Sequence, residues 1–167
     1  MGNLETPDII LRPIGYIRTP FSSSAGMPIQ GAHAPGAEGW IELFPEFAQG
    51  IRDLEGFERI WLAFYFHRAI SFQLMVRPFL DTVEHGIFAT RAPARPNPIG
   101  ITAVRLLRIE GLRLRIADVD MIDQTPLLDI KPYVPDFDRF DAVRIGWYND
   151  VLTAGTVADD RFESKER

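Results

Sequence analysis

The sequence predicts a single-domain, mainly β protein: an antiparallel β-barrel with one or two short helices. Its 167 residues, 46% of them hydrophobic, suffice for one core and hardly for two. About six short runs have strand character and one segment has helical spacing, a pattern that indicates an antiparallel barrel or sandwich, of which we predict the barrel. The chain has no internal repeat and no strand-helix-strand alternation, which disfavours a parallel sheet.

The N-terminal part is expected to contain two strands and a long loop. The run LRPIGYIRTPF predicts an edge strand that stops at Thr19-Pro20, because proline cannot donate to a strand ladder. Residues 22–39 are dense in Ser, Gly, Pro and Ala without periodicity, so they predict a loop. The run WIELF that follows alternates polar and apolar residues as a strand does.

A short helix and a central strand are expected next. Residues 45–57 place Phe47, Ile51 and Leu54 on one helical face, and Pro45 suits a first turn. The run RIWLAFYFH is so apolar and aromatic that it predicts a central strand without a solvated face.

The C-terminal half predicts a buried strand, a hairpin and a charged tail. GIFAT is interpreted as the buried strand, and ITAVRLLRI and LRLRIADVDMI as a hairpin that turns at Glu110-Gly111. Residues 124–138 are punctuated by prolines, and the charged tail DDRFESKER is expected to fray. We expect a barrel domain over residues 1–140 and a C-terminal extension over 141–167.

Several functional classes lack support in the sequence. Cysteine is absent and only three histidines are present, so we expect no metal site. No apolar run approaches the roughly 20 residues that cross a bilayer, and the first ten residues carry acids where a signal peptide would be basic, so we expect a cytoplasmic protein with no membrane partner. Rossmann, Walker and GxSxG motifs are missing. The net charge of −5 disfavours a generic polyanion binder.

The stretch RAPARPNPIGIT, residues 91–102, predicts a stiff arch. Each proline fixes its own φ and biases the preceding residue toward extended conformations. Such a stretch is rich in carbonyl acceptors and poor in donors, so it could accept hydrogen bonds from an amino group such as that of adenine. The alternative is that the prolines only stiffen a link between strands.

Four segments occur in an order that resembles the TsaA-like (TrmO-like) family: IGYIRTPF, GFERIWLAFYFHR, GIFATRAPARPNPIGIT and DVDMIDQTPLLDIKPYVP. The resemblance covers roughly residues 9 to 138. It implies a homodimeric β-barrel enzyme that uses S-adenosylmethionine to methylate N6 of threonylcarbamoyladenosine beside the tRNA anticodon. The additional C-terminal domain of longer bacterial members is expected to be absent.

The resemblance also implies a cofactor site, which would draw on Ile29, Gln30, Gly31, His67, Arg68, Arg91, Ile122, Asp123, Gln124 and Thr125. Family members usually have glycine where this chain has Gln124. If that position requires a positive φ, the glutamine must bear backbone strain.

These residue types suit the cofactor's chemistry. Arg91 can pair with the cofactor carboxylate in a bidentate fork. His67 can bind a ribose or carboxylate, or it is a capped core histidine. Asp123 can accept from a ribose hydroxyl or amino group, or it is a solvated turn residue.

For catalysis, alignment of the acceptor should dominate, and a general base would help because the lone pair of N6 is delocalised. Asp129 is the candidate base, and Lys131 would stabilise negative charge or grip a phosphate. Alternatively, the two form a structural turn with a surface ion pair.

A tRNA surface is suggested by six arginines, and Tyr133 could stack on a flipped base. The arginines are Arg91, Arg95, Arg105, Arg108, Arg113 and Arg115. An ordinary solvated sheet face explains them equally well. Three functions therefore stay open: a tRNA methyltransferase, a non-catalytic module that binds S-adenosylmethionine or a nucleotide, and a methyltransferase for a different small substrate. A surplus of apolar and aromatic residues adds to the expectation of a homodimer.

Overall fold

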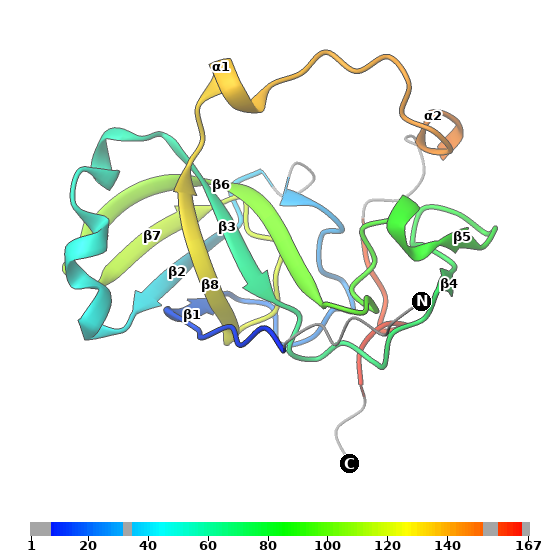
Figure 1. Ribbon diagram of the computed structural model, residues 1–167, viewed down its shortest axis with the longest axis horizontal. Coiled ribbons are helices and arrows are strands. Elements are labelled where there is room, and N and C mark those ends of the chain that lie inside the picture. Colours follow the sequence, from blue (N-terminus) through cyan, green and yellow to red (C-terminus); the bar gives the residue numbers. More distant parts are fainter. Residues whose placement is uncertain (1–7, 32–34, 152–156, 165–167) are drawn as a thin grey trace, which may run out of the picture.

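Six antiparallel strands close a barrel in the computed structural model, which describes residues 8–31, 35–151 and 157–164 (Figure 1). Around the barrel the order is β1-β2-β7-β6-β3-β8. The strands are β1 (Gly15–Arg18), β2 (Glu38–Leu43), β3 (Arg59–Tyr65), β6 (Ile99–Glu110), β7 (Arg113–Ala117) and β8 (Thr125–Pro132). The predicted fold class is confirmed.

The smaller elements lie outside the barrel wall. A two-stranded unit, β4 (Met75–Val76) and β5 (His85–Gly86), lies beyond one end of the barrel (Figure 1). In the described ranges, 3-10 helices span Pro45–Ile51, Leu54–Gly56 and Ile87–Ala89, and the one-turn helices are α1 (Pro135–Asp138) and α2 (Tyr148–Val151). The chain between α1 and α2 runs from the barrel to the side of the β4-β5 unit (Figure 1).

The core follows from alternation along the strands. In β3, Ile60, Leu62 and Phe64 are buried in the barrel, while Trp61 and Ala63 are half-buried between them. Gly100, opposite Phe64 in β6, is needed for packing, because a Cβ there would lie 2.4 Å from the Phe64 ring. The central position of β3 is confirmed, but the predicted absence of a solvated face is wrong, since Tyr65 is exposed.

Three local predictions need correction. β1 is not an edge strand, because it pairs with β2 on one side and β8 on the other. The helix over residues 45–57 is two 3-10 turns that bury none of their own residues. GIFAT is not a strand: Ile87–Ala89 is a 3-10 turn with Ile87 buried and Phe88 77% exposed. A turn of this kind needs only one buried apolar side chain, here Ile87. A short apolar run is compatible with a strand or a turn, so it does not predict the backbone conformation.

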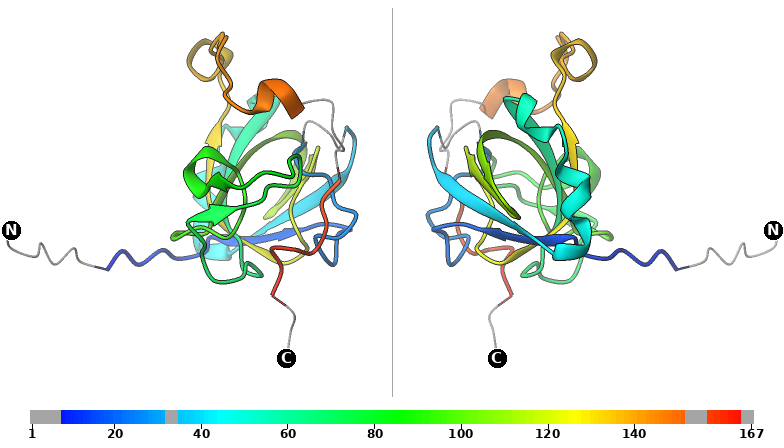
Figure 2. Two further views of the ribbon diagram at one scale, coloured as in Figure 1. Left: turned by 90° about the vertical axis from the view of Figure 1, so that its right-hand side faces the viewer. Right: turned by 90° about the vertical axis from the view of Figure 1, so that its left-hand side faces the viewer.

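The charged tail is packed rather than frayed up to Ser164. Phe162 is buried in a second apolar cluster with Val76, Ile87 and Ala94, and Ile70 donates its N–H to the Phe162 carbonyl oxygen at 3.1 Å. The predicted fraying beyond Ser164 falls on 165–167, which lie outside the described residues. At the other end, residues 8–12 are exposed and extend away from the barrel (Figure 2).

The β6-β7 hairpin turns at Glu110-Gly111 as predicted, and Gly111 has a φ of 59°. Gln124, in the turn before β8, has a φ of 63°. Position 124 therefore has the positive φ that glycine adopts freely, and glutamine bears the backbone strain there.

Replacing Gln124 with glycine should stabilise the ligand-free protein by about 0.5–1 kcal/mol, because glycine adopts this φ without a Cβ clash. The reverse control, Gly111→Ala, should destabilise by about 1 kcal/mol, since its Cβ would meet nothing within 4 Å and only the backbone conformation would suffer. Urea unfolding monitored by circular dichroism measures both changes. A loss of stability in Gln124→Gly would show that the glutamine side chain stabilises the turn.

Candidate functional site

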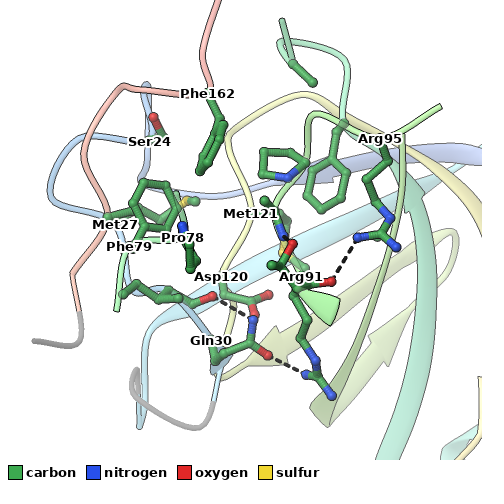
Figure 3. Close-up of a pocket in the computed structure, with 18 of the residues that line it drawn as sticks. Ser24, Met27, Gln30, Pro78, Phe79, Arg91, Arg95, Asp120, Met121 and Phe162 are labelled. Atoms are coloured by element: carbon green, nitrogen blue, oxygen red, sulfur yellow. Dashed lines mark hydrogen bonds between the residues drawn. The ribbon is translucent and has the colours of Figure 1, made fainter. Parts of the chain in front are cut away.

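A pocket of about 650 Å³ is lined by one end of the barrel, by the loop between β4 and β5 and by the C-terminal segment; Figure 3 shows many of its lining residues. That volume is in the range of small-molecule and cofactor sites. The barrel contributes the C-terminal end of β3, the N-terminal end of β6 and the residues that precede β8. The loop before β2 contributes Ser24 and Met27–Gln30. The proline-rich stretch contributes Arg91, Ala92, Pro93 and Arg95.

One side of the pocket is apolar and aromatic. Phe64 and Phe66 form an edge-to-face pair at 5.2 Å, and Phe79 and Phe162 form another at 5.2 Å. Met27, Pro78 and Met121 also line the pocket (Figure 3). Such walls suit a ligand with an aromatic base.

The polar side is formed by Gln30, Arg91 and Asp120, which lie near one another (Figure 3). Arg91 donates from Nη1 to Oε1 of Gln30 at 2.5 Å. Asp120 Oδ2 accepts from the Gly31 N–H at 2.7 Å and from the Thr102 hydroxyl at 3.3 Å. Its other oxygen, Oδ1, is buried and has no hydrogen-bond partner among the described residues. Burial raises the pKa of Asp120 to about 6, against the effect of these hydrogen bonds.

His67 follows the end of β3 by two residues and lines the pocket, with its Nδ1 3.5 Å from the Thr125 hydroxyl. Burial, assisted by the charge of Arg68, lowers the pKa of His67. This shift favours the neutral imidazole, which can both donate and accept a hydrogen bond.

Glu163 fastens the C-terminal segment to the pocket wall. Its carboxylate accepts from the Ser24 N–H and hydroxyl, both at 2.9 Å, and pairs with Arg68 at 3.2 Å. Burial alone would raise the pKa of Glu163, but the hydrogen bonds from Ser24 and Arg68 outweigh it and lower the pKa.

An aromatic stack of His85, Trp147 and Tyr148 borders the pocket. Trp147 lies 4.4 Å from the His85 ring and 3.9 Å from the Tyr148 ring, and its indole N–H donates to the Ala89 carbonyl oxygen at 2.9 Å. Trp147 and Tyr148 both line the pocket. These residues form an aromatic surface near Arg91. Burial raises the pKa of the Tyr148 hydroxyl, and the positive charge of Arg91 opposes this rise.

The structure brings most of the predicted cofactor residues together. Those that line the pocket are Ile29, Gln30, His67, Arg68, Arg91, Ile122 and Thr125. Gly31, Asp123 and Gln124 are not in the lining but adjoin residues that are. Asp123 Oδ1 accepts from the Thr19 N–H at 3.1 Å and pairs with Arg18 at 3.1 Å. The assigned binding roles of all ten stay predictions.

The structure does not bring Asp129 and Lys131 to the pocket. They pair with each other at 2.8 Å on β8, with 49% and 72% of their side chains exposed. They lie four and six residues beyond Thr125, the pocket residue at the start of β8, and an extended chain covers roughly 13 Å in four residues. The geometry matches the structural alternative, a surface ion pair, and the catalytic roles stay untested predictions.

The proline-rich stretch is an arch tied down by Arg95. The Arg95 guanidinium donates to the Ile87 and Thr90 carbonyl oxygens at 3.1 and 2.9 Å. These carbonyls are therefore occupied within the protein, while Ala92 and Pro93 line the pocket.

Arginines gather on the outer face of β6 and β7, but acids accompany them. Arg108, Arg113 and Arg115 lie over the Trp40 ring at 5.7, 4.7 and 5.9 Å. They pair with Glu110 at 2.6 Å, with Glu42 at 3.4 Å and with Glu38, respectively. This outer face is locally near neutral, which weakens it as a phosphate-binding surface.

The fold and the pocket define a β-barrel protein with a pocket whose aromatic wall and charged side chains suit a small molecule with an aromatic base and charged groups. Residues 16–139 match the model of the tRNA-methyltransferase O N-terminal domain, and the chain belongs to that family. The resemblance predicted from the four motifs is confirmed.

Relatives and solved structures agree with this family. A Pyrococcus abyssi protein named as a probable S-adenosyl-L-methionine-binding protein is 55% identical over 139 residues, which cover 83% of this chain and 76% of that protein. A rat tRNA (adenine(37)-N6)-methyltransferase is 35% identical, with 81% of this chain and 33% of that protein covered. The crystal structure of TrmO from P. aeruginosa superposes with a TM-score of 0.74 at 39% identity, covering 88% of this chain and 64% of that chain.

Sequence reasoning missed much of the pocket lining, including Asp120, Trp147, Tyr148, Phe162 and Glu163. Asp120 left a signal, since it is an acid between the apolar Val119 and Met121 in a strand-like run. In the described ranges, no cluster of three or more acidic or histidine side chains could hold a metal ion. Over the same ranges, no helix is long and apolar enough to cross a bilayer.

Proposed function

We propose that the protein is an S-adenosylmethionine-dependent methyltransferase that acts on N6 of adenine in tRNA. The observation that carries the proposal is the pocket, where seven of the residues that the family motifs assign to the cofactor converge. Relatives in the family are named as S-adenosyl-L-methionine-binding proteins and as tRNA (adenine(37)-N6)-methyltransferases. The chain spans about a third of the rat enzyme and under two thirds of the P. aeruginosa TrmO chain, so the activity is inferred from the shared domain.

The pocket residues fit this cofactor. Phe64, Phe66 and Met121 provide an apolar wall for the adenine, and the neutral His67 can bond to the ribose. Arg91 provides a fork for the carboxylate. When bound, S-adenosylmethionine supplies an electrophilic methyl group. The protein's task is then to align the acceptor nitrogen and exclude water, because the thioether leaves without a proton.

We propose, more specifically, that the substrate is threonylcarbamoyladenosine beside the anticodon and that the reaction takes place in the cytoplasm. The aromatic stack of Trp147 and Tyr148 supports an acceptor base at this end of the pocket. A carbamoyl substituent acidifies N6–H, so a carboxylate or a neutral imidazole could remove the proton. Asp129 with Lys131 remains the motif-based candidate for the base.

The second candidate is a non-catalytic S-adenosylmethionine-binding module. It is favoured by the archaeal relatives, whose names state binding alone, including an Archaeoglobus fulgidus protein that is 38% identical and 93% covered. The third, a methyltransferase for a different small substrate, would be distinguished by its acceptor.

The test is incubation of the purified protein with methyl-labelled S-adenosylmethionine and total tRNA from cells with and without the threonylcarbamoyl modification. We expect label only in the modified tRNA. Label in both tRNA pools would keep the methyltransferase and exclude the modified substrate. Cofactor binding without any label in tRNA would favour the binding module, and turnover in a small-molecule extract without tRNA would favour the third candidate.

Arg91→Ala should weaken S-adenosylmethionine binding by about 1.5–3 kcal/mol, roughly 10- to 100-fold, because a charge-assisted hydrogen-bonded pair is lost. Arg91→Lys should recover part of the loss, since a point charge does not reproduce a planar fork. Calorimetric titration measures each affinity, with a thermal melt to confirm folding.

The control is Arg113→Ala, which removes an arginine that contacts Trp40 and Glu42 outside the pocket lining. Its affinity for S-adenosylmethionine should equal that of the unaltered protein. An unchanged affinity in folded Arg91→Ala would mean that Arg91 serves the structure, through Gln30, or the RNA surface.

We also propose a homodimer. It is supported by large apolar side chains that are exposed to water in the single chain. Near the N-terminus, Ile9 and Ile10 are 85% and 82% exposed. After α1, Phe140 and Val143 are 82% and 91% exposed. Sedimentation at micromolar concentration should give twice the mass of one chain, and a monomer would contradict the proposal.

A further inference from the structure

Asp120 is the pocket residue whose bonding is incomplete. Its Oδ2 is used twice, by the Gly31 N–H at 2.7 Å and by the Thr102 hydroxyl at 3.3 Å. Its Oδ1 is buried without a partner among the described residues, although Asp120 lines the pocket. A buried carboxylate oxygen without a donor destabilises the fold, so a donor supplied by a ligand would satisfy it.

The other charged groups at the pocket are already engaged. Arg68 is paired with Glu163 at 3.2 Å, and Arg95 is held by two carbonyl oxygens. Among the described residues, Arg91 is the cation whose charge lowers the pKa of Asp120, against the dominant effect of burial. Asp120 and Arg91 lie on the same side of the pocket (Figure 3).

We infer that Arg91 and Asp120 together recognise the α-amino acid end of the cofactor, with Arg91 binding its carboxylate and Asp120 Oδ1 accepting from its ammonium group. A zwitterion presents one anion and one cation close together, and an arginine beside an unpartnered carboxylate is the complementary arrangement. Oδ2 meanwhile holds Gly31, so the same carboxylate fixes the Ile29–Gly31 loop against the barrel. The inference rests on the proposed function, since it assumes the same cofactor.

Two ligands isolate the amino acid end. S-adenosylhomocysteine keeps the zwitterion but has a neutral sulfur, whereas methylthioadenosine keeps the adenine, ribose and neutral sulfur and lacks the zwitterion. Asp120→Asn should weaken S-adenosylhomocysteine 10- to 100-fold, the usual loss for a charged hydrogen bond, and should change methylthioadenosine less than twofold. Calorimetric titration at pH 7.5 measures both.

A matched control is Glu110→Gln, which removes one negative charge from the far end of the β6-β7 hairpin and should leave both affinities unchanged. If Asp120→Asn weakens S-adenosylmethionine but not S-adenosylhomocysteine, Asp120 faces the sulfonium and the assignment to the ammonium is overturned. Equal losses for both neutral-sulfur ligands place Asp120 at the ribose or in a structural role and also overturn it. No binding of any of these ligands by the unaltered protein would instead refute the proposed function.

The pH dependence separates direct binding from a structural role. Ammonium binding requires ionised Asp120, and the pKa of Asp120 is about 6 in the free protein. S-adenosylhomocysteine affinity should therefore fall about tenfold between pH 8 and pH 5, and this fall should vanish in Asp120→Asn. His67, whose pKa is lowered, and Tyr148, whose pKa is raised, face the same pocket and persist in the variant, so they account for any pH dependence that remains.

Thr102→Val provides a second variant. The Thr102 hydroxyl donates to Oδ2 and thereby lowers the pKa of Asp120. Its removal should raise that pKa, so the pH midpoint of binding should move upward while binding at pH 8 is retained. An unmoved midpoint would assign the titration to another group and contradict the inference.

A ligand-free measurement completes the test. A carboxyl whose folded pKa is raised contributes stability below its unfolded pKa and loses it as pH rises through about 6. Asp120→Asn should therefore melt at a higher temperature than the unaltered protein at pH 8, with the difference shrinking toward pH 4. A variant that melts lower at pH 8 would show that the carboxylate serves the fold, and would overturn the inference.

Discussion

Closure of the barrel by β8 is the constraint on which the pocket depends. β8 pairs with β1 through Thr125–Leu127 and with β3 through Leu127–Pro132. Because both neighbours fix its register, the turn that precedes β8 has one position relative to the ends of β3 and β6. Asp120, Met121, Ile122 and Thr125 reach the pocket in this way, so a large part of the site is set by strand pairing.

Asp118 holds the other end of that turn. With a φ of 67°, it turns the chain out of β7 and accepts from Arg59 at 3.1 Å, from Arg105 at 3.0 and 3.3 Å, and from the Gly36 N–H at 3.0 Å. Burial alone would raise the pKa of Asp118, but these bonds and charges lower it. Asp120, two residues later, has a raised pKa and an unpartnered oxygen. Two neighbouring aspartates thus differ in kind: one is fully bonded within the fold, and the other is left to a ligand.

The sequence predicted the parts of the fold whose side chains alternate or whose turns need a particular residue. β2, β7 and the β6-β7 turn at Gly111 are of this kind. GIFAT was misread because a five-residue apolar run is compatible with a strand and with a turn that buries one residue. Closure of the barrel, which removes the predicted edge of β1, depends on pairing between strands more than 100 residues apart, and no local pattern reports it.

The site residues that belong to sequence motifs could be predicted, whereas those held by ion pairs between distant parts of the chain could not. Ile29, Gln30, His67, Arg68 and Arg91 came from family motifs and do meet at one pocket. Glu163 lies in a run of charges that is typical of a frayed tail, yet its bonds to Ser24 and Arg68 span 139 and 95 residues. The segment from Ile145 to Glu163 lies beyond the family match, which ends at residue 139, and it still supplies Trp147, Tyr148 and Phe162 to the pocket. The residues that the motifs assign to the cofactor thus come from the barrel and from two of its loops, whereas part of the remaining wall is formed by a segment outside the family match. Glu163, which belongs to this segment, pairs with Arg68, so the segment also holds one of the residues that the motifs assign to the cofactor.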